Sequence, residues 1–354
     1  MSHSSTLDKQ KKYLFFISQD YSFPVLRPLQ EAIWSRGDEV VWFMYGDEIS
    51  KDALNENEVE LKTITEVVAY LPDAVFVPGN VVPSFISGLK VEVFHGLPST
   101  KAKKSGELYH FIIRGMFDLY CTQGESSTKP FEVLADKHKY FRVKETGWCK
   151  LDPLFPLVQK DSTRKSIFFA STFSPRFSKA KVLYPLLLEM MKKYDFDWYI
   201  TLHPKMSQEV VDMYKNIALD NVTFVESVDI MDSFKEADMM LCDTSSIIYE
   251  FLIQKKPVVT FQTQKEEASI INITKIEELE SQILKTLDNL ELNQENIEKH
   301  LELFHPYVDG QSSQRVLDSV EEMLADKKAF GLKRKPLNLI RNFKLRKELG
   351  YWKF

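Results

Sequence analysis

Residues 239–261 read MMLCDTSSIIYEFLIQKKPVVTF, and their pattern decides the fold. The apolar run 239–242 predicts a buried strand, Ile247 to Leu252 predict a helix, and Val258 to Phe261 predict a second strand. A strand, a helix and a parallel strand that follow one another this closely form a βαβ unit. The stretch therefore indicates a parallel sheet with helices packed against it.

The polar turn inside this stretch, Asp243-Thr244-Ser245-Ser246, is a candidate anion site. The first N–H groups of a helix have no partner within the helix, and the helix dipole adds partial positive charge there, so phosphate binds well. Asp and Ser also cap helices that bind nothing. Taken alone, the turn fits a capped helix and a phosphate site equally well.

The same alternation of apolar runs and helix-like segments extends in both directions along the chain. Strands are predicted at 13–18, 39–45, 73–79, 90–96 and 119–124, with helices at 24–37 and 125–136 and helix-like residues between 79 and 90. After residue 156, strands at 165–170, 198–202, 222–225 and 239–242 alternate with helices at 178–194, 206–219 and a short one before 239, and residues 266–299 form an acidic, helical flank. We therefore expect an α/β protein with two Rossmann-like domains that face a central cleft.

A proline-rich junction at 151–156 separates the two halves. The expected division is a polar N-terminal extension at 1–12, an N-terminal domain at 13–155, a C-terminal domain at 156–330 and a tail at 331–354. Ligands of open α/β sheets bind beyond the carboxyl ends of the strands, so the functional residues are expected there.

Composition places the chain among ordinary globular proteins. It has 354 residues and a net charge of −5, which gives no general reason to expect nucleic-acid binding. The cysteines Cys121, Cys149 and Cys242 are widely separated, which favours a reducing cytoplasm over a disulfide framework or a zinc site. The N-terminal residues lack the apolar core of a signal peptide, and no apolar run reaches the roughly 20 residues that span a bilayer.

The tail, residues 331–354, differs from the rest of this acidic chain. Its basic residues Lys333, Arg334, Lys335, Arg341, Lys344, Arg346, Lys347 and Lys353 alternate with apolar and aromatic residues, and Glu348 is its one acid. This basic amphipathic pattern favours reversible attachment to an anionic membrane surface. A final helix that packs across the two domains and exposes its lysines to water would show the same pattern.

Two histidines follow predicted strands in the two halves. His95 precedes Gly96 and the lysines at 101, 103 and 104, and an imidazole there can take a proton from an attacking hydroxyl near neutral pH. His203-Pro204-Lys205 occupies the matching place in the second half, where its cationic groups would meet a diphosphate. A histidine that merely ends a strand would look the same in either case.

Two further motifs have a weaker signal. Asp309-Gly310 precedes Ser313 and Arg315 at a predicted helix start, where arginine can form two parallel hydrogen bonds to a phosphate, although a capped helix with a surface arginine is the simpler alternative. Asp195-Phe196-Asp197 matches a metal-binding D-x-D pattern, but its position before a strand favours a turn. No metal site is expected.

Together these motifs resemble the CDP-glycerol glycerophosphotransferases, which include teichoic-acid primases and polymerases and their relatives in capsule and lipopolysaccharide synthesis. The resemblance runs from about residue 91 to 317. It rests on the ordered set His95-Gly96 with Lys101, Gly147-x-x-Lys150-x-Asp152, His203-Pro204, Asp243-Thr244-Ser245-Ser246-x-x-x-Glu250, and Asp309-Gly310 with Ser313 and Arg315. Here Gly147 to Asp152 keeps a glycine, a base and the acid, without the family's proline.

The resemblance implies a GT-B fold and transfer of glycerol phosphate, or a related polyol phosphate, from CDP-glycerol to a glycan or lipid-linked acceptor, with release of CMP and no cofactor. His95 resembles the catalytic base of an N-terminal acceptor domain, and His203, Lys205, Thr244, Ser245, Ser246, Glu250 and Arg315 resemble the donor site of a nucleotide-binding domain. Gly96, Lys101, Lys150, Asp152, Asp243, Asp309 and Ser313 would support these groups. A cytoplasmic enzyme on the inner face of the membrane would follow. A GT-B glycosyltransferase and a non-catalytic scaffold of polysaccharide assembly are the alternatives.

Overall fold

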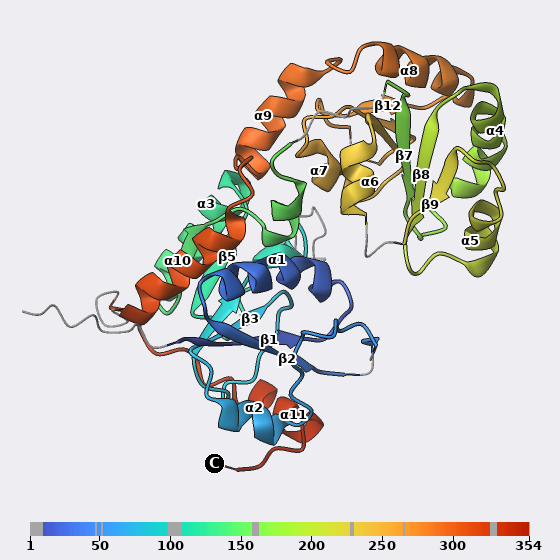
Figure 1. Cartoon of the computed structure of the whole chain (residues 1–354). Coiled ribbons are helices and arrows are strands. Elements are labelled where there is room, and N and C mark those ends of the chain that lie inside the picture. Colours follow the sequence, from blue (N-terminus) through green and yellow to red (C-terminus); the bar gives the residue numbers. More distant parts are fainter. Residues whose placement is uncertain are drawn as a thin grey trace, which may run out of the picture. The chain divides into compact units, whose positions relative to one another are not determined.

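The computed structural model describes residues 10–46, 48–50, 52–97, 108–157, 163–226, 230–264, 266–325 and 331–353. The chain divides into unit 1, residues 1–152 with 311–354, and unit 2, residues 153–310. Each unit contains a six-stranded sheet, and every strand pairing in both sheets is parallel (Figure 1). The expected α/β class with two Rossmann-like domains is confirmed.

Unit 1 has the strand order β2-β1-β3-β4-β5-β6. Its elements are β1 Lys12–Ile17, α1 Ser22–Ser35, β2 Glu39–Met44, α2 Ile64–Tyr70, β3 Ala74–Val77, β4 Leu89–Glu92, η1 Tyr109–Phe111, β5 Leu119–Thr122, α3 Glu125–His138, β6 Arg142–Glu145, η2 Cys149–Leu154, α10 Ser312–Ala325 and α11 Leu339–Glu348. Figure 1 shows α1 and α10 on one face of the sheet and α2 and α11 on the other. Leu345 of α11 is buried with Ile64 and Val67 of α2 in the core of that second face.

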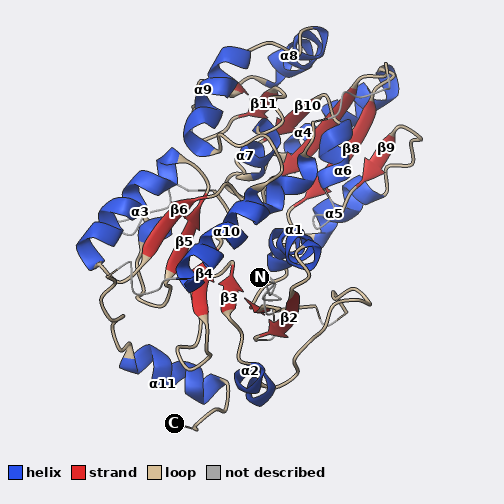
Figure 2. Ribbon diagram, turned by 60° about the vertical axis from the view of Figure 1, so that its left-hand side comes forward, coloured by secondary structure: helices blue, strands red, loops and turns tan. Residues whose placement is uncertain are grey.

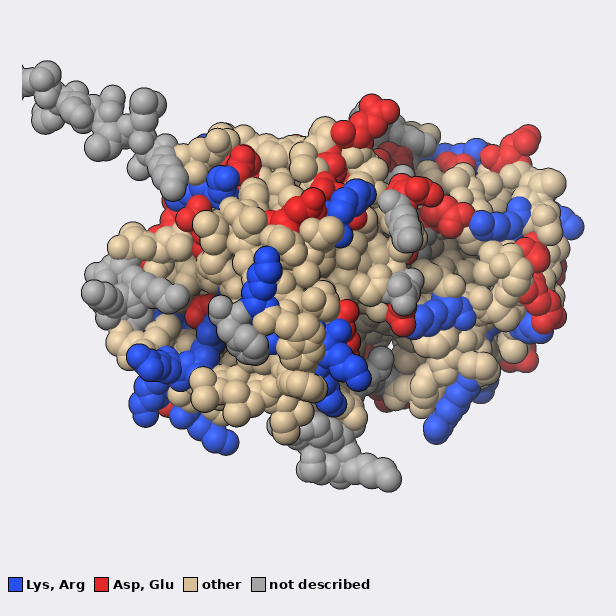
Figure 3. Space-filling view, turned by 90° about the horizontal axis from the view of Figure 1, so that it is seen from below, with Lys and Arg blue, Asp and Glu red and all other residues tan. Residues whose placement is uncertain are grey.

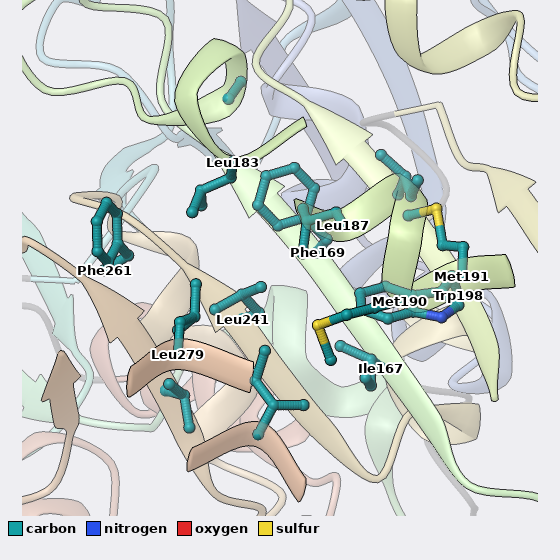
Figure 4. Close-up of a cluster of buried hydrophobic side chains, with 14 of the residues drawn as sticks. Ile167, Phe169, Leu183, Leu187, Met190, Met191, Trp198, Leu241, Phe261 and Leu279 are labelled. Atoms are coloured by element: carbon teal, nitrogen blue, oxygen red, sulfur yellow. The ribbon is translucent and has the colours of Figure 1, made fainter. Parts of the chain in front are cut away.

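Unit 2 has the strand order β12-β11-β10-β7-β8-β9. Its elements are β7 Ser166–Ser171, α4 Ala180–Lys193, β8 Asp197–Leu202, α5 Gln208–Lys215, β9 Val222–Phe224, α6 Met231–Glu236, β10 Met239–Cys242, α7 Ile247–Leu252, β11 Val258–Phe261, β12 Ile271–Ile273, α8 Ile276–Asp288 and α9 Gln294–Phe304. Figure 4 shows Phe169 and Leu241 of the strands packed with Leu183 and Leu187 of α4 and Leu279 of α8. Burial of such side chains stabilises each by about 1.5–3 kcal/mol.

Several local predictions were wrong. The described residues between β3 and β4 contain turns and no helix, because Pro83 interrupts the segment and Gly88 packs where a Cβ would lie 2.3 Å from the carbonyl oxygen of Pro72. Strand β6, all four of whose residues are only half-buried, was not predicted, since it lacks a clear apolar run. Strand β12 lies within the stretch expected to be helical, where it pairs with β11.

The expected division at residues 155 and 330 differs from the one observed, because α10 returns to unit 1 (Figures 1 and 2). Arg36 at the end of α1 forms ion pairs with Asp318 at 2.6 Å and Glu321 at 3.0 Å, and Lys11 also pairs with Glu321 at 2.9 Å. A local pattern predicts the helix but not the sheet against which it packs. From its position in the chain, α10 was assigned to the C-terminal domain, whereas in the structure it belongs to unit 1.

Candidate functional site

Three loops meet at the carboxyl edge of the unit 1 sheet. They follow β1, β3 and β4, which are neighbours in the sheet and run parallel. The first carries Tyr21, the second Pro78 and the third His95, the proposed base. Because parallel strands end at the same edge, residues separated by more than 70 positions in sequence come into contact here.

The hydrogen bonding of His95 fixes its tautomer. Its Nδ1 lies 3.0 Å from the carbonyl oxygen of Pro78. A carbonyl oxygen can only accept, so Nδ1 carries the proton of the neutral ring and Nε2 keeps a lone pair. The side chain is exposed. An exposed imidazole with its lone pair on Nε2 meets the requirement of a general base.

The backbone before His95 has an unusual conformation. Phe94 has φ +58°, the left-handed region that a bulky residue rarely adopts. Trp148 Nε1 donates to the Phe94 carbonyl at 3.2 Å, and the side-chain amide of Gln123 donates to the Gly96 carbonyl at 3.2 Å. Such strained residues persist where the surroundings hold them, and they cluster at functional sites.

A second histidine lies close to this loop. The His110 ring stacks on Phe94 with centroids 4.9 Å apart. Burial, together with a smaller effect of the charge on His95, lowers the pKa of His110 to about 4. His110 is therefore neutral near pH 7.

The other residues proposed around His95 are less informative. A Cβ on Gly96 would meet no atom of the described residues within 4 Å. Lys101 lies outside the described residues.

In unit 2, three loops again meet at the carboxyl edge of neighbouring strands, β10, β7 and β8. Asp243 follows β10 and is almost fully buried. Its carboxylate accepts a hydrogen bond from the Ser171 hydroxyl, from the Thr172 N–H at 2.9 Å and from the Lys179 N–H at 3.0 Å. Burial raises the pKa of Asp243, and these donors oppose that effect. Asp243 thus orients the β7–α4 loop.

His203 follows β8 and lies against that loop. Its ring packs on Phe173 with centroids 4.3 Å apart, and its backbone N–H donates to the Ser171 carbonyl at 3.3 Å. His203 Nδ1 accepts from the Lys205 N–H at 3.0 Å, so the proton of the neutral ring is on Nε2. In His95 the proton is on Nδ1, whereas in His203 it is on Nε2, an N–H donor of the kind that binds an anion. Lys205, two residues after His203, has an exposed side chain.

The Asp243–Ser246 turn connects β10 to α7, as predicted. The hydroxyl of Thr244 accepts from the Gln264 N–H at 3.2 Å and so joins this turn to the loop after β11. Ser245 is half-buried and Ser246 is exposed, while Glu250 on α7 is largely buried. Helix α7 has only six residues, so a phosphate here would depend on the surrounding loops as much as on the helix.

A surface cavity of about 460 Å³ is lined by the loop that follows β11 in unit 2. Glu266, Glu267 and Asn272 contribute to its lining. Neither Ser245 nor Ser246 is among the described residues that line it, and its acidic side chains would repel a phosphate.

The Asp309–Arg315 motif is in unit 1 from Gln311 onward. Asp152 accepts from the Ser312 N–H at 2.9 Å and from the Ser313 N–H at 2.7 Å, so it caps the start of α10. Arg315 lies on the first turn of α10 and therefore in a different unit from His203, contrary to its expected domain. Lys150 Nζ lies 5.3 Å from the Trp148 ring centre.

The D-x-D pattern forms a structural ion-pair cluster. Arg164 pairs with Asp195 at 2.6 Å and with Asp197 at 3.0 Å. Asp197 begins β8, so the cluster lies at the amino end of the strand, opposite to His203. This geometry agrees with the expected turn.

The sequence interpretation did not identify two sets of residues at these edges. Tyr21 contacts His95, and Ser171 to Phe173 contact Asp243 and His203. Their position in the sequence could have identified them. Each set follows a predicted strand, and ligands of α/β sheets bind beyond the carboxyl ends of the strands.

Comparisons with known proteins give two related groups. The sequence model of the UDP-N-acetylglucosamine 2-epimerase family matches residues 157–321, less than half of the 354-residue chain. A 79-residue segment is 29% identical to the minor teichoic acid biosynthesis protein GgaB of Bacillus subtilis (strain 168). That segment is 22% of this chain and 9% of that protein, so the chain aligns with only a small part of its length.

Solved structures match over almost the whole chain. The wall teichoic acid polymerase TagF has a TM-score of 0.66 at 16% identity, with 90% of each chain covered. A UDP-N-acetylglucosamine 2-epimerase has a TM-score of 0.56 at 15% identity, with 93% of this chain and 98% of that chain covered. At such identities the likeness establishes the fold: this chain has the two-domain GT-B-like fold of these enzymes.

Proposed function

We propose that this protein transfers glycerol phosphate, or a related polyol phosphate, from CDP-glycerol to a hydroxyl of a cell-surface glycan or lipid-linked acceptor. The observation that carries the proposal is the exposed His95 at the carboxyl edge of the unit 1 sheet, whose Nδ1 is bonded to the Pro78 carbonyl so that Nε2 keeps the lone pair. Phosphoryl-type transfer to a hydroxyl needs such a base on the acceptor side.

Unit 2 supplies the features expected of a donor site. Nε2–H of His203, the exposed Lys205 and the serines of the Asp243–Ser246 turn are donors or cations at or near the carboxyl edge of one sheet. Such groups neutralise a diphosphate without a metal ion. The TagF likeness includes a structure obtained after a CDPG soak, with a TM-score of 0.61, which supports the same choice of donor.

In the proposed reaction, Nε2 of His95 takes the proton from the acceptor hydroxyl. The hydroxyl oxygen attacks the phosphorus that carries glycerol, and the bond from that phosphorus to the oxygen of CMP breaks. His203, Lys205, Ser245 and Ser246 would neutralise the diphosphate charge, and Arg315 is a further candidate from α10. Positioning and charge neutralisation provide most of the rate acceleration in such transfers.

A donor panel tests this function. Purified protein is incubated with an acceptor fraction and with CDP-glycerol, CDP-ribitol or UDP-N-acetylglucosamine, and the nucleotide products are separated. We expect CMP from a CDP-polyol, because the attack on phosphorus leaves one phosphate on the nucleotide. Release of UDP would identify a glycosyltransferase, and no turnover of any donor would support a scaffold.

A second candidate function follows from the family-model match. An epimerase-like enzyme would convert UDP-N-acetylglucosamine into its 2-epimer. The same donor panel distinguishes epimerisation from transfer. Epimerisation inverts one carbon of the sugar and leaves the sugar attached to UDP, so no free nucleotide is released. That outcome would replace the transfer proposal.

The tail, residues 331–353, suggests where the enzyme acts. It docks on unit 1: Lys335 Nζ donates to Asp118 at 2.8 Å, and Asn338 donates to the carbonyls of Arg114 and Gly115, each at 3.0 Å. Gly115 has φ +72°, and a Cβ there would lie 2.4 Å from Pro336, so this contact requires glycine. The tail is therefore anchored on the domain that also carries His95.

The docked tail still exposes large apolar side chains. The exposed residues are Leu337, Leu339, Ile340, Phe343 and Trp352, with exposed fractions from 47% to 76%. In Figure 3, which views the side that carries α11, Lys and Arg gather on part of unit 1 beside uncharged surface. Apolar side chains among cations favour the surface of an anionic bilayer, at the inner face of the cell membrane. Within the described ranges, no helix is long and apolar enough to cross a bilayer.

The double substitution Ile340→Ser with Phe343→Ser tests this membrane contact without disturbing the buried Leu345. We expect sedimentation with phosphatidylglycerol vesicles to fall at least about tenfold, because two apolar side chains leave the lipid interface. Binding of the wild type should also weaken with salt. The control is Val182→Ser with Leu303→Ser, two exposed apolar residues on α4 and α9 of unit 2. Equal binding by all three proteins would contradict the contact.

A further inference from the structure

Tyr21 contacts the candidate base from a neighbouring strand. It lies at the N-cap position of α1, in the loop that follows β1. Its ring centre is 4.8 Å from that of His95, and the two planes are inclined by 31°. The Pro78 carbonyl, which follows β3, holds Nδ1 of the same imidazole. His95 is thus held by residues of two adjacent loops.

Both contacts oppose rotation of the imidazole about its Cβ–Cγ bond. The hydrogen bond resists it because turning χ2 carries Nδ1 away from the Pro78 carbonyl oxygen. The χ2 torsion of histidine is broad, so a single hydrogen bond on an exposed side chain holds the ring only weakly. An aromatic ring packed against the imidazole face opposes the rotation. Together the contacts define the direction in which the Nε2 lone pair points.

The loop that carries Tyr21 is itself well held. Asp20 accepts hydrogen bonds from the Ser50 N–H at 2.9 Å and from the Ser50 hydroxyl at 2.8 Å. Gln19 donates to Glu48 at 2.5 Å, and the Ser22 N–H bonds to the Gln19 carbonyl at 3.0 Å. Although Tyr21 is 39% exposed, its backbone is fixed on both sides. The ring is therefore a stable support for His95.

We propose that Tyr21 is a positioning residue, whose aromatic face holds the His95 imidazole so that Nε2 stays aimed at the acceptor hydroxyl. The role in transfer rests on the proposed function, whereas the orientation of His95 does not. The tyrosine hydroxyl has no part in this role, so a phenylalanine should replace it. An aliphatic side chain should not.

The first test needs no substrate. Protein labelled with ¹⁵N-histidine is prepared as wild type, Tyr21→Phe, Tyr21→Leu and Tyr21→Gln, and the ring nitrogens of His95 are observed by NMR. We expect wild type and Tyr21→Phe to show one tautomer, protonated on Nδ1, and the Leu and Gln variants to show mixed tautomers or exchange broadening. Unchanged His95 signals in folded Leu and Gln variants would overturn the proposal.

The second test measures transfer. In Tyr21→Leu and Tyr21→Gln we expect kcat to fall about tenfold or more, with KM for both substrates unchanged, because a misaimed base slows the chemical step. Tyr21→Phe should stay within about twofold of wild type. Tyr109→Leu, a change at another exposed tyrosine of unit 1, is the control. A raised acceptor KM with unchanged kcat would overturn positioning. If no donor is turned over while the NMR arm succeeds, the proposed function fails and the orientation of His95 stands.

Discussion

His95→Ala is expected to lower the turnover of transfer from CDP-glycerol by about 10²–10⁴-fold, the usual contribution of a general base. The imidazole that receives the acceptor proton is lost, and the alanine methyl group can neither bond the Pro78 carbonyl nor accept a proton. The affinity for CDP-glycerol should change little, because the proposed diphosphate contacts of unit 2 do not include His95. Single-turnover kinetics and calorimetric titration with the donor measure the two quantities separately.

The matched control is His138→Ala, which removes a histidine at the end of α3 whose ring packs on Tyr140. Its turnover should equal that of wild type. A His95→Ala protein that keeps near-normal turnover would exclude His95 as the base. An equal loss in both variants would indicate a general effect on folding, and their melting temperatures would then differ from that of wild type.

The sequence predicted those parts of the site that depend on local order. Strand ends are local features, so the pattern of apolar runs was enough to place His95, His203 and the Asp243 turn at carboxyl edges. The tautomers of the two histidines could not be predicted, because each depends on the folded loop geometry: His95 bonds a carbonyl 17 positions away, and His203 bonds the N–H of Lys205 within its own loop. The contact of Tyr21 with His95 could not be predicted for the same reason.

The role of Asp152 shows a second limit. Its place in a family-like motif suggested a supporting residue, and the structure shows that it caps α10 from 160 positions away. Arg315 follows in the same helix, and the ion pairs of Arg36 hold that helix on unit 1. Long-range ion pairs and caps decide the unit to which a helix belongs, and periodicity contains no information about them.

Asp243→Ala is expected to lower the free energy of unfolding by about 3 kcal/mol, because one buried and two partly buried donors lose their acceptor at once. Asp243→Asn should fall between this variant and wild type: it keeps an acceptor for one N–H, but its amide group faces another donor. Burial raises the pKa of the Asp243 carboxyl, because a charged carboxylate is less stable away from water. The neutral amide of the Asn variant avoids this desolvation penalty, which offsets part of the stability lost with the hydrogen bonds. Urea unfolding monitored by circular dichroism measures the order of the three proteins.

The same change should weaken donor binding more than it slows the chemical step. Asp243 holds Thr172 and Lys179 in the β7–α4 loop, and Phe173 of that loop packs on His203. Once the loop loses its acceptor, it no longer supports the His203 ring, so the KM for the donor should rise while His95 is unaffected. Asp220→Ala, at an exposed aspartate of unit 2, is the control. If Asp243→Ala unfolds within about 0.5 kcal/mol of wild type, the carboxylate does not organise the loop, and the donor site must be assigned to other residues.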